Sequence, residues 1–290
     1  MEIFFTRNYV SFPTNQNLIR IEFGRSHSTQ TDKFGYSKLL NEIKQVFRTS
    51  RPRHFLRVFS SPLHSLKAFK YHYRRVSERD FVLFIAKQQK CSDDSIDRAY
   101  EDLAHNRGFW EETEQKLSLY AKNYGLQMTK ELSALYLLVR LFQPNQMVET
   151  GVSAGVSSVY ILSAMEDNNM GRLYSIDLPP DNLPEGKSVG WVVPDNLRKR
   201  WSLHIGNSLD LLGPVLSSIG TIDCFVHDSL HTYDHMRWEF NTAWKYLRPG
   251  GLFLSHDVGA NDAFFDFMSE NSISWSAYRV FHVLGGFIKP

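Results

Sequence analysis

The 290-residue sequence has little cysteine, no long apolar run and almost no net charge. Its two cysteines, Cys91 and Cys224, lie far apart and show no metal-binding spacing, so a disulfide framework is excluded and a reducing compartment is expected. The longest apolar runs, such as 81–86, are far too short to cross a bilayer, and the first residues lack the apolar core of a signal peptide. We therefore expect a cytoplasmic protein without a membrane span.

A formal net charge of +2 gives the chain no strong field for nucleic acid, and no nucleic-acid-binding motif is present. The stretch from Arg48 to Arg75 is locally basic, with arginines and lysines interleaved with aromatic residues. Such a stretch is compatible with an anionic substrate, a membrane surface or RNA, but the solvated face of a helical cap explains it as well. We expect no nucleic-acid partner.

The character of the chain changes near residue 145. Before it the sequence is aromatic, basic and mostly helical in period. Candidate elements there are a strand at 19–23 and helices at 38–47, 95–104, 109–124 and 129–142, the last capped by Thr129 and followed by Pro144. We predict two regions, a mainly helical region 1–125 that serves as a cap or an oligomerisation region, and a domain at 126–290.

After Pro144 short apolar runs alternate with helical patterns, which predicts a parallel sheet with crossover helices. Candidate strands are 147–150, 173–176, 202–205, 222–227 and 252–256, and candidate helices are 156–165, 209–217, 231–247 and 262–270. A final pair of strands, 278–283 and 287–289, is joined by a predicted turn at Leu284-Gly285-Gly286. The predicted fold class is α/β, a Rossmann-like doubly wound sheet with an antiparallel last strand, preceded by a mainly helical N-terminal extension.

A glycine-containing loop leaves the first of these strands and enters a helix, in the sequence Glu149-Thr150-Gly151-Val152-Ser153-Ala154-Gly155. Its spacing is not G-x-G-x-x-G, so binding of a dinucleotide pyrophosphate is poorly supported. A ligand carboxylate can accept hydrogen bonds from the N–H groups of the loop and helix, and Glu149 can pair with a ligand ammonium group directly or through water. A plain tight turn explains the glycines about as well.

Polar residues also follow the next two strands. Asp177 ends the strand at 173–176, where an acidic residue can accept both hydroxyls of a ribose, although an aspartate that starts a loop is the simpler alternative. Asn207 and Ser208 follow the strand at 202–205. They can contact an adenine amino group or cap the helix that begins near Leu209, and the sequence does not decide between these roles.

The densest group of ionisable residues follows the last two parallel strands. Both strands end in His-Asp, at His227-Asp228 and His256-Asp257, and His231 lies just beyond the first pair. In a doubly wound sheet both strand ends open onto one crevice. Carboxylates and a histidine there can hold Mg²⁺ or Mn²⁺, and His231 can instead act as a general base.

Together these sites resemble the class I S-adenosylmethionine (SAM) dependent methyltransferases, from about Thr129 to the C-terminus and including a Leu-Arg-Pro-Gly-Gly turn at 247–251. The stretch 227–236, with a later strand ending in His-Asp, is similar to the branch that contains catechol and macrolide-sugar O-methyltransferases. The resemblance implies that SAM contacts Glu149, Gly151, Asp177 and Ser208. The predicted cofactor site is completed by the loop and helix-start residues Ser153, Gly155 and Asn207.

The resemblance further implies a metal site at Asp228 and Asp257 and a general base at His231. From the residues themselves we add His256 as a third metal ligand and Asp228 as the catalytic partner of His231. His256 stands where the sugar-modifying enzymes carry an acidic residue, and catechol-type enzymes carry Asp-Asn at the position of His256-Asp257. The expected function is therefore methyl transfer from SAM to a hydroxyl of a small molecule or sugar, assisted by Mg²⁺ or Mn²⁺ where the site holds one.

Two other functions fit parts of the same pattern. One is a metal-dependent hydroxylase or other oxidoreductase on a related fold, which the absent G-x-G-x-x-G motif disfavours for a nicotinamide cofactor. The other is a non-catalytic SAM-binding module, which the dense ionisable groups at the strand ends disfavour. Fold alone does not separate these three classes.

Overall fold

The computed structural model describes residues 4–5, 9–13, 18–22, 75–106, 110–111, 113–118, 132–179, 183–279 and 283–290. The chain divides into two compact units, Met1–Ser60 and Ser61–Pro290. In the first unit, β1 (Phe4–Phe5), β2 (Tyr9–Pro13) and β3 (Leu18–Glu22) form an antiparallel sheet in that order. The strand β3 confirms the one predicted at 19–23. The helix predicted at 38–47 and the basic stretch before Arg75 lie outside the described residues.

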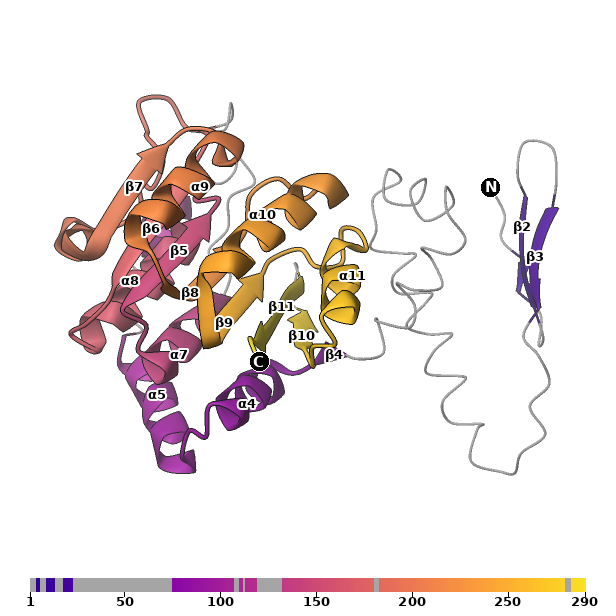
Figure 1. Ribbon diagram of the computed structural model, residues 1–290, viewed down its shortest axis with the longest axis horizontal. Coiled ribbons are helices and arrows are strands. Elements are labelled where there is room, and N and C mark those ends of the chain that lie inside the picture. Colours follow the sequence, from indigo (N-terminus) through magenta and orange to yellow (C-terminus); the bar gives the residue numbers. More distant parts are fainter. Residues whose placement is uncertain are drawn as a thin grey trace. The chain divides into compact units, whose positions relative to one another are not determined.

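The second unit is built on an eight-stranded sheet with the order β4-β10-β11-β9-β8-β5-β6-β7 (Figure 1). The strands are β4 (Arg75–Val76), β5 (Gln146–Thr150), β6 (Arg172–Asp177), β7 (Trp201–Ile205), β8 (Ile222–His227), β9 (Leu247–Ser255), β10 (Ser276–Arg279) and β11 (Val283–Ile288). The five strands β5 to β9 are mutually parallel, whereas β11 runs antiparallel to both β9 and β10. This confirms the doubly wound sheet with an antiparallel last strand.

The strand order reverses between β5 and β8. From β5 the chain proceeds outward through β6 and β7, and it then crosses back to lay β8 on the other side of β5. Ligands of doubly wound sheets bind beyond the carboxyl ends of the strands at such a reversal. The topology therefore predicts a ligand site beside Thr150 and His227, the last residues of β5 and β8.

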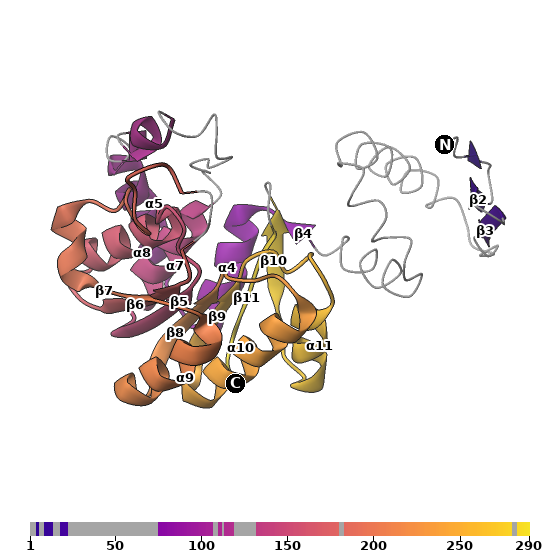
Figure 2. The same ribbon diagram turned by 90° about the horizontal axis from the view of Figure 1, so that it is seen from above.

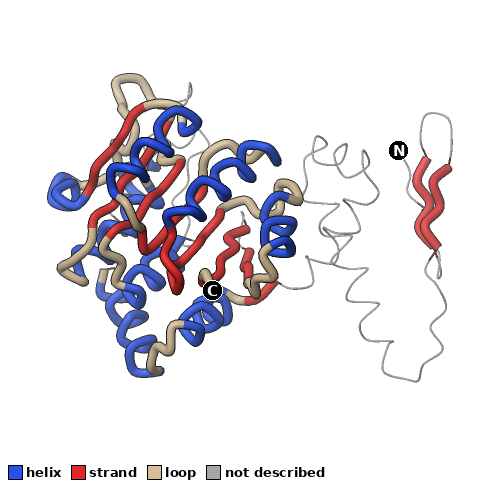
Figure 3. The backbone as a smooth tube through the Cα atoms, viewed as in Figure 1, coloured by secondary structure: helices blue, strands red, loops and turns tan. Residues whose placement is uncertain are grey.

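Helices cover both faces of the sheet (Figures 2 and 3). One layer contains α4 (Glu78–Gln88), α5 (Asp93–His105), α7 (Ser133–Phe142) and α8 (Val156–Asp167), and the other contains α9 (Ser208–Ile219), α10 (Tyr233–Tyr246) and α11 (Ala263–Glu270). Successive strand residues serve opposite layers: Met147 joins the first core and Val148 the second. Because strand side chains alternate in direction, a strand buried on both faces is apolar throughout.

Most of the predicted helices and strands are confirmed, with ends that differ by a few residues. Helix α7 begins at Ser133, and the predicted cap Thr129 lies outside the described residues. Of the helix predicted at 109–124, residues 110–111 and 113–118 are helical. Helix α4 was not predicted; Phe81, Val82 and Ile85 lie on it and are fully buried in the first core. None of the described helices is long and apolar enough to cross a membrane.

Two predicted turns are wrong, because both lie inside strands. Leu284-Gly285-Gly286 belongs to β11. A Cβ atom at Gly285 would lie 2.9 Å from the Phe264 side chain, and a Cβ atom at Gly286 would lie 2.6 Å from the Leu254 side chain. These glycines serve close packing instead of a reversal of the chain. The Leu-Arg-Pro-Gly-Gly stretch at 247–251 is the first half of β9, where the pairing with β8 shifts register near Ile222 and Gly250 takes φ 72°.

Candidate active site

The glycine loop lies against the end of β8. The N–H of Gly151 donates to the carbonyl of Ile176, and Asp228 N–H donates to the carbonyl of Thr150 at 2.7 Å. Gly151 has φ 86°, and a Cβ there would lie 2.0 Å from the carbonyl oxygen of Asp228. Only glycine fits this contact, which brings the predicted cofactor loop and the predicted acceptor residues into direct contact.

Asp177 already anchors the glycine loop. Its Oδ2 accepts a hydrogen bond of 2.7 Å from the N–H of Ser153, which has φ 50°. Burial raises the pKa of Asp177, and the N–H donors of Ser153 and Val152 act in the opposite direction. The structure thus places Asp177 beside the loop, as predicted, and a carboxylate retains acceptor capacity for a ribose hydroxyl.

Glu149 lies beneath the loop and is fully buried. Its carboxylate accepts hydrogen bonds from Ser157 (2.5 Å), Ser158 (2.6 Å) and Ser175 (2.7 Å). Burial raises the pKa of Glu149 to about 7 in spite of these donors. Its predicted contact with a cofactor ammonium stays a prediction, and its contacts within the fold join β5, β6 and the start of α8.

The residues predicted to meet adenine lie at the start of α9. Asn207 caps this helix, because its side chain accepts a hydrogen bond of 3.0 Å from the N–H of Leu209. Ser208 is buried, and its Oγ lies 3.1 Å from Nε2 of His235. The capping role of Asn207 is confirmed, whereas an adenine contact by either residue stays a prediction. Gly155, the last glycine of the loop, precedes α8 with φ 101°.

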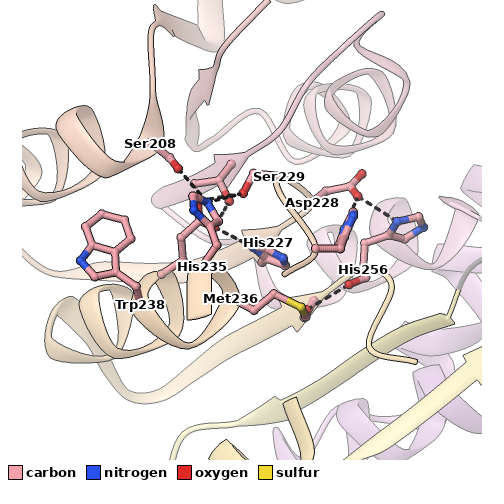
Figure 4. Close-up of polar contacts among 12 residues, drawn as sticks. Ser208, His227, Asp228, Ser229, His235, Met236, Trp238 and His256 are labelled. Atoms are coloured by element: carbon pink, nitrogen blue, oxygen red, sulfur yellow. Dashed lines mark hydrogen bonds and ion pairs between the residues drawn. The ribbon is translucent and has the colours of Figure 1, made fainter. Parts of the chain in front are cut away.

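The cluster at the ends of β8 and β9 is centred on one carboxylate oxygen. Oδ1 of Asp228 lies 2.8 Å from Nδ1 of His256 and 3.5 Å from Nε2 of His231, as Figure 4 shows for the His256 contact. Burial acts to raise the pKa of Asp228, but the contacts with His256 and His231 hold it well below its usual range. Donor atoms of these three residues all lie within 4.8 Å of one another.

Asp257 is placed differently from the prediction. Its Oδ2 lies 3.6 Å from Nδ1 of His231, on the side of the ring opposite to Asp228, and its backbone takes φ 49°. Asp257 is therefore not one of the three grouped donors, and it contacts the imidazole of His231 instead. The side chains of Asp228, His231 and Asp257 are 26%, 24% and 28% exposed, so the cluster is open to solvent on one side.

A second polar cluster lies beside the first (Figure 4), and its residues His227 and Glu239 are fully buried. Its centre is Glu239 of α10, a fully buried carboxylate that contacts both His227 and His235. Glu239 and His235 are not among the site residues predicted from the sequence. The available signal was an acidic residue inside the apolar stripe of α10, since Glu239 stands between Met236 and Phe240 on the helix face that covers the sheet.

The part of the chain that forms the sheet is similar to known methyltransferases. Residues 148–258 match a family model described as a methyltransferase domain. The fold is similar to the O-methyltransferase TomG from Streptomyces achromogenes, which is involved in tomaymycin synthesis and was solved with SAM; the two share 17% identity over 62% of this chain and 90% of that one, with a TM-score of 0.50. Residues 148–258 thus resemble a methyltransferase domain, and the fold is the Rossmann-like one of this solved O-methyltransferase.

Two further solved structures are similar. An O-methyltransferase from Bacillus cereus in complex with SAH, the demethylated product of SAM, shares 15% identity over 73% of this chain and the whole of that one, with a TM-score of 0.45. A methyltransferase from Geobacter sulfurreducens shares 20% identity over 61% of this chain and 88% of that one, with a TM-score of 0.47. A search of curated proteins by sequence found no match.

Proposed function

We propose that the protein transfers the methyl group of SAM to a hydroxyl of a small-molecule or sugar-bearing acceptor. The observation that carries the proposal is the contact between Gly151 and the carbonyl of Asp228. It sets the loop that is to hold SAM beside the ionisable cluster that is to meet the acceptor, at the point where the strand order reverses.

The cofactor half of the site is proposed to hold SAM along the loop from Gly151 to Gly155, with its ribose on Asp177. Two apolar side chains beside these residues, Leu178 (61% exposed) and Ile205 (55% exposed), offer faces for the adenine ring. Glu149 contributes by holding the serines beneath the loop.

The acceptor half is proposed to lie around His231. Leu230 (57% exposed) and Tyr233 (41% exposed) flank it in the chain and suit the apolar body of a small acceptor. In the reaction, the acceptor oxygen attacks the methyl carbon, the bond from that carbon to sulfur breaks, and SAH leaves. His231 receives the hydroxyl proton, while Asp228 and Asp257 orient its ring and stabilise the imidazolium. Most of the acceleration comes from alignment of the two reactants.

The same cluster fits a divalent ion. Asp228, His231 and His256 would hold it, and a bound ion would supply Lewis acidity that lowers the pKa of the acceptor hydroxyl. This donor set replaces the predicted Asp257 by His231, and two imidazoles favour Mn²⁺ or a later transition ion over Mg²⁺, which prefers oxygen ligands. Asp257 would then orient His231 through its other ring nitrogen.

Transfer of tritium from methyl-labelled SAM to a panel of phenols, catechols and glycosides tests the proposal. Transfer to a hydroxyl, lost in His231→Ala with SAH affinity unchanged, is the expected result, and absence of transfer to every hydroxyl acceptor would refute O-methylation. EDTA then tests for a metal ion. Turnover that survives chelation favours His231 as the base without a metal ion, and turnover that chelation abolishes and Mn²⁺ restores shows that the site works with a metal ion.

Residues 1–125 are proposed to contribute a cap over the acceptor or a homo-oligomer contact. A cytoplasmic location is likewise a proposal. It is supported by the free thiols of Cys91 and Cys224.

A further inference from the structure

Glu239 is a buried charged group on the mainly apolar inner face of α10. It has no exposed surface, and its neighbours on the inner face of α10 are Met236, Phe240 and Ala243. A carboxylate buried in this way is costly unless each oxygen is hydrogen-bonded. Burial acts to raise the pKa of Glu239, but the hydrogen bonds from His227 and His235 lower it well below its usual range.

Both oxygens of Glu239 are fully used. Oε2 accepts from Oγ1 of Thr150 and from Nδ1 of His227, each at 2.6 Å. Oε1 accepts from Oγ of Ser229 at 2.8 Å and from Nε2 of His235 at 2.9 Å. These donors come from three different segments of the chain, so one side chain joins parts that the backbone does not join.

The donors stand next to the residues that the proposed reaction uses. Thr150 immediately precedes Gly151, and His227 and Ser229 immediately flank Asp228. His235 continues the network to Ser208, the first residue of α9, over 3.1 Å. The cofactor half and the acceptor half of the site thus share one buried carboxylate.

The network also extends toward His231. The ring of His227 makes an edge contact with the ring of His231, with centroids 5.4 Å apart. His227 makes a second edge contact with the ring of Phe240. Among the described residues, Nε2 of His227 has no hydrogen-bond partner. A buried ring nitrogen in this position costs free energy, which a purely structural cluster would be expected to avoid.

We propose that Glu239 is a positioning residue that holds the SAM loop and the Asp228–His231 segment in register with each other. The inference rests on the proposed function. The new element is the role of Glu239. This buried carboxylate contacts neither reactant, yet it maintains the alignment on which methyl transfer depends. Affinity for the cofactor and the geometry of the acceptor half depend together on Glu239.

Calorimetric titration of the full-length chain with SAH tests this role. Glu239→Gln keeps the shape of the side chain but removes its charge, and we expect its dissociation constant for SAH to rise about tenfold or more, as for loss of hydrogen bonds to a charged group. In the SAH-saturated variant, the side-chain ¹⁵N signals of His231 should also move.

Asp223→Asn is the matched control. Asp223 lies at the opposite end of β8 and accepts hydrogen bonds from the N–H groups of Asn145 and Gln146 and from Arg248. Its loss should lower the melting temperature and leave SAH affinity within about twofold, because it braces the far edge of the sheet. A folded Glu239→Gln protein with wild-type SAH affinity and unmoved His231 signals would overturn the proposal.

A second pair of variants decides the question if Glu239→Gln does not fold. His235→Leu removes the link to Ser208, while His235→Gln places an amide nitrogen near the position of Nε2. Weakened SAH binding in the first, restored in the second, supports the proposal, and wild-type affinity in both overturns it. Failure of the wild-type chain itself to bind SAH would refute the proposed function, which is a different outcome.

Discussion

Replacing Glu149 by glutamine should remove a pH-dependent loss of folding stability. Glu149 is fully buried, and its pKa rises from 4.5 to about 7 on folding. Because the folded-state pKa lies above the unfolded-state value, the stability that the protonated group contributes is fully present below about pH 4.5 and is lost as the pH rises through about 7. At about 1.4 kcal/mol for each unit, the full difference is about 3 kcal/mol.

Urea unfolding of wild type and Glu149→Gln at about pH 5 and about pH 8 measures this cost. Glutamine resembles the protonated carboxyl group, so the variant should gain about 2–3 kcal/mol relative to wild type between the two pH values. Other titrating groups are common to both proteins and cancel in the comparison. Glu166→Gln is the control, at a partly exposed position of α8 whose carboxylate pairs with Lys199 and Arg200, and it should show no such gain. Parallel pH profiles for wild type and Glu149→Gln would refute the reasoning.

Three other predictions concern the loop and the domain. Asp177→Ala should raise the SAH dissociation constant, measured by calorimetry, at least about tenfold. The control Asp195→Ala, at an exposed position, should leave it unchanged. Equal SAH affinity in Asp177→Ala and wild type would remove Asp177 from the site. Gly151→Ala should lower unfolding free energy by more than about 1 kcal/mol and weaken SAH binding, because its Cβ would clash with Asp228; wild-type behaviour in both assays would contradict the close contact. A chain starting at Ser61 should keep a cooperative unfolding transition, whereas one starting at Gln127 should lose it, since α4 is removed from the core; cooperative unfolding of the shorter chain would contradict this.

The sequence predicted the parallel sheet and its edge because these depend on short-range patterns. Apolar runs bounded by turns marked the strands, and the polar residues that follow them, Asp177 and Asp228 among them, mark the edge where ligands bind. The glycines of β11 could not be read in this way. Gly285 and Gly286 look like a turn in the sequence, and only the side chains that press on them, such as Phe264, explain them as strand residues.

The roles of the charged residues were harder to predict, because they depend on partners distant in the sequence. The contact of Glu149 with the cofactor stays a prediction, and its burial among serines could not be predicted because one of them, Ser175, lies on the neighbouring strand. Asp257 was grouped with the metal ligands, yet a left-handed backbone turns it toward His231. Glu239 belongs to no sequence motif, and its role appears only in the structure, where the ends of β5 and β8 converge on it.

Titration of the full-length chain with SAH, followed by calorimetry, tests the central claim most directly. We expect saturable binding of one SAH for each chain, with a rise in melting temperature that grows with SAH concentration, as for any ligand of the folded state alone. The absence of both heat and thermal stabilisation at high SAH concentration would contradict a SAM-dependent methyltransferase built on this crevice.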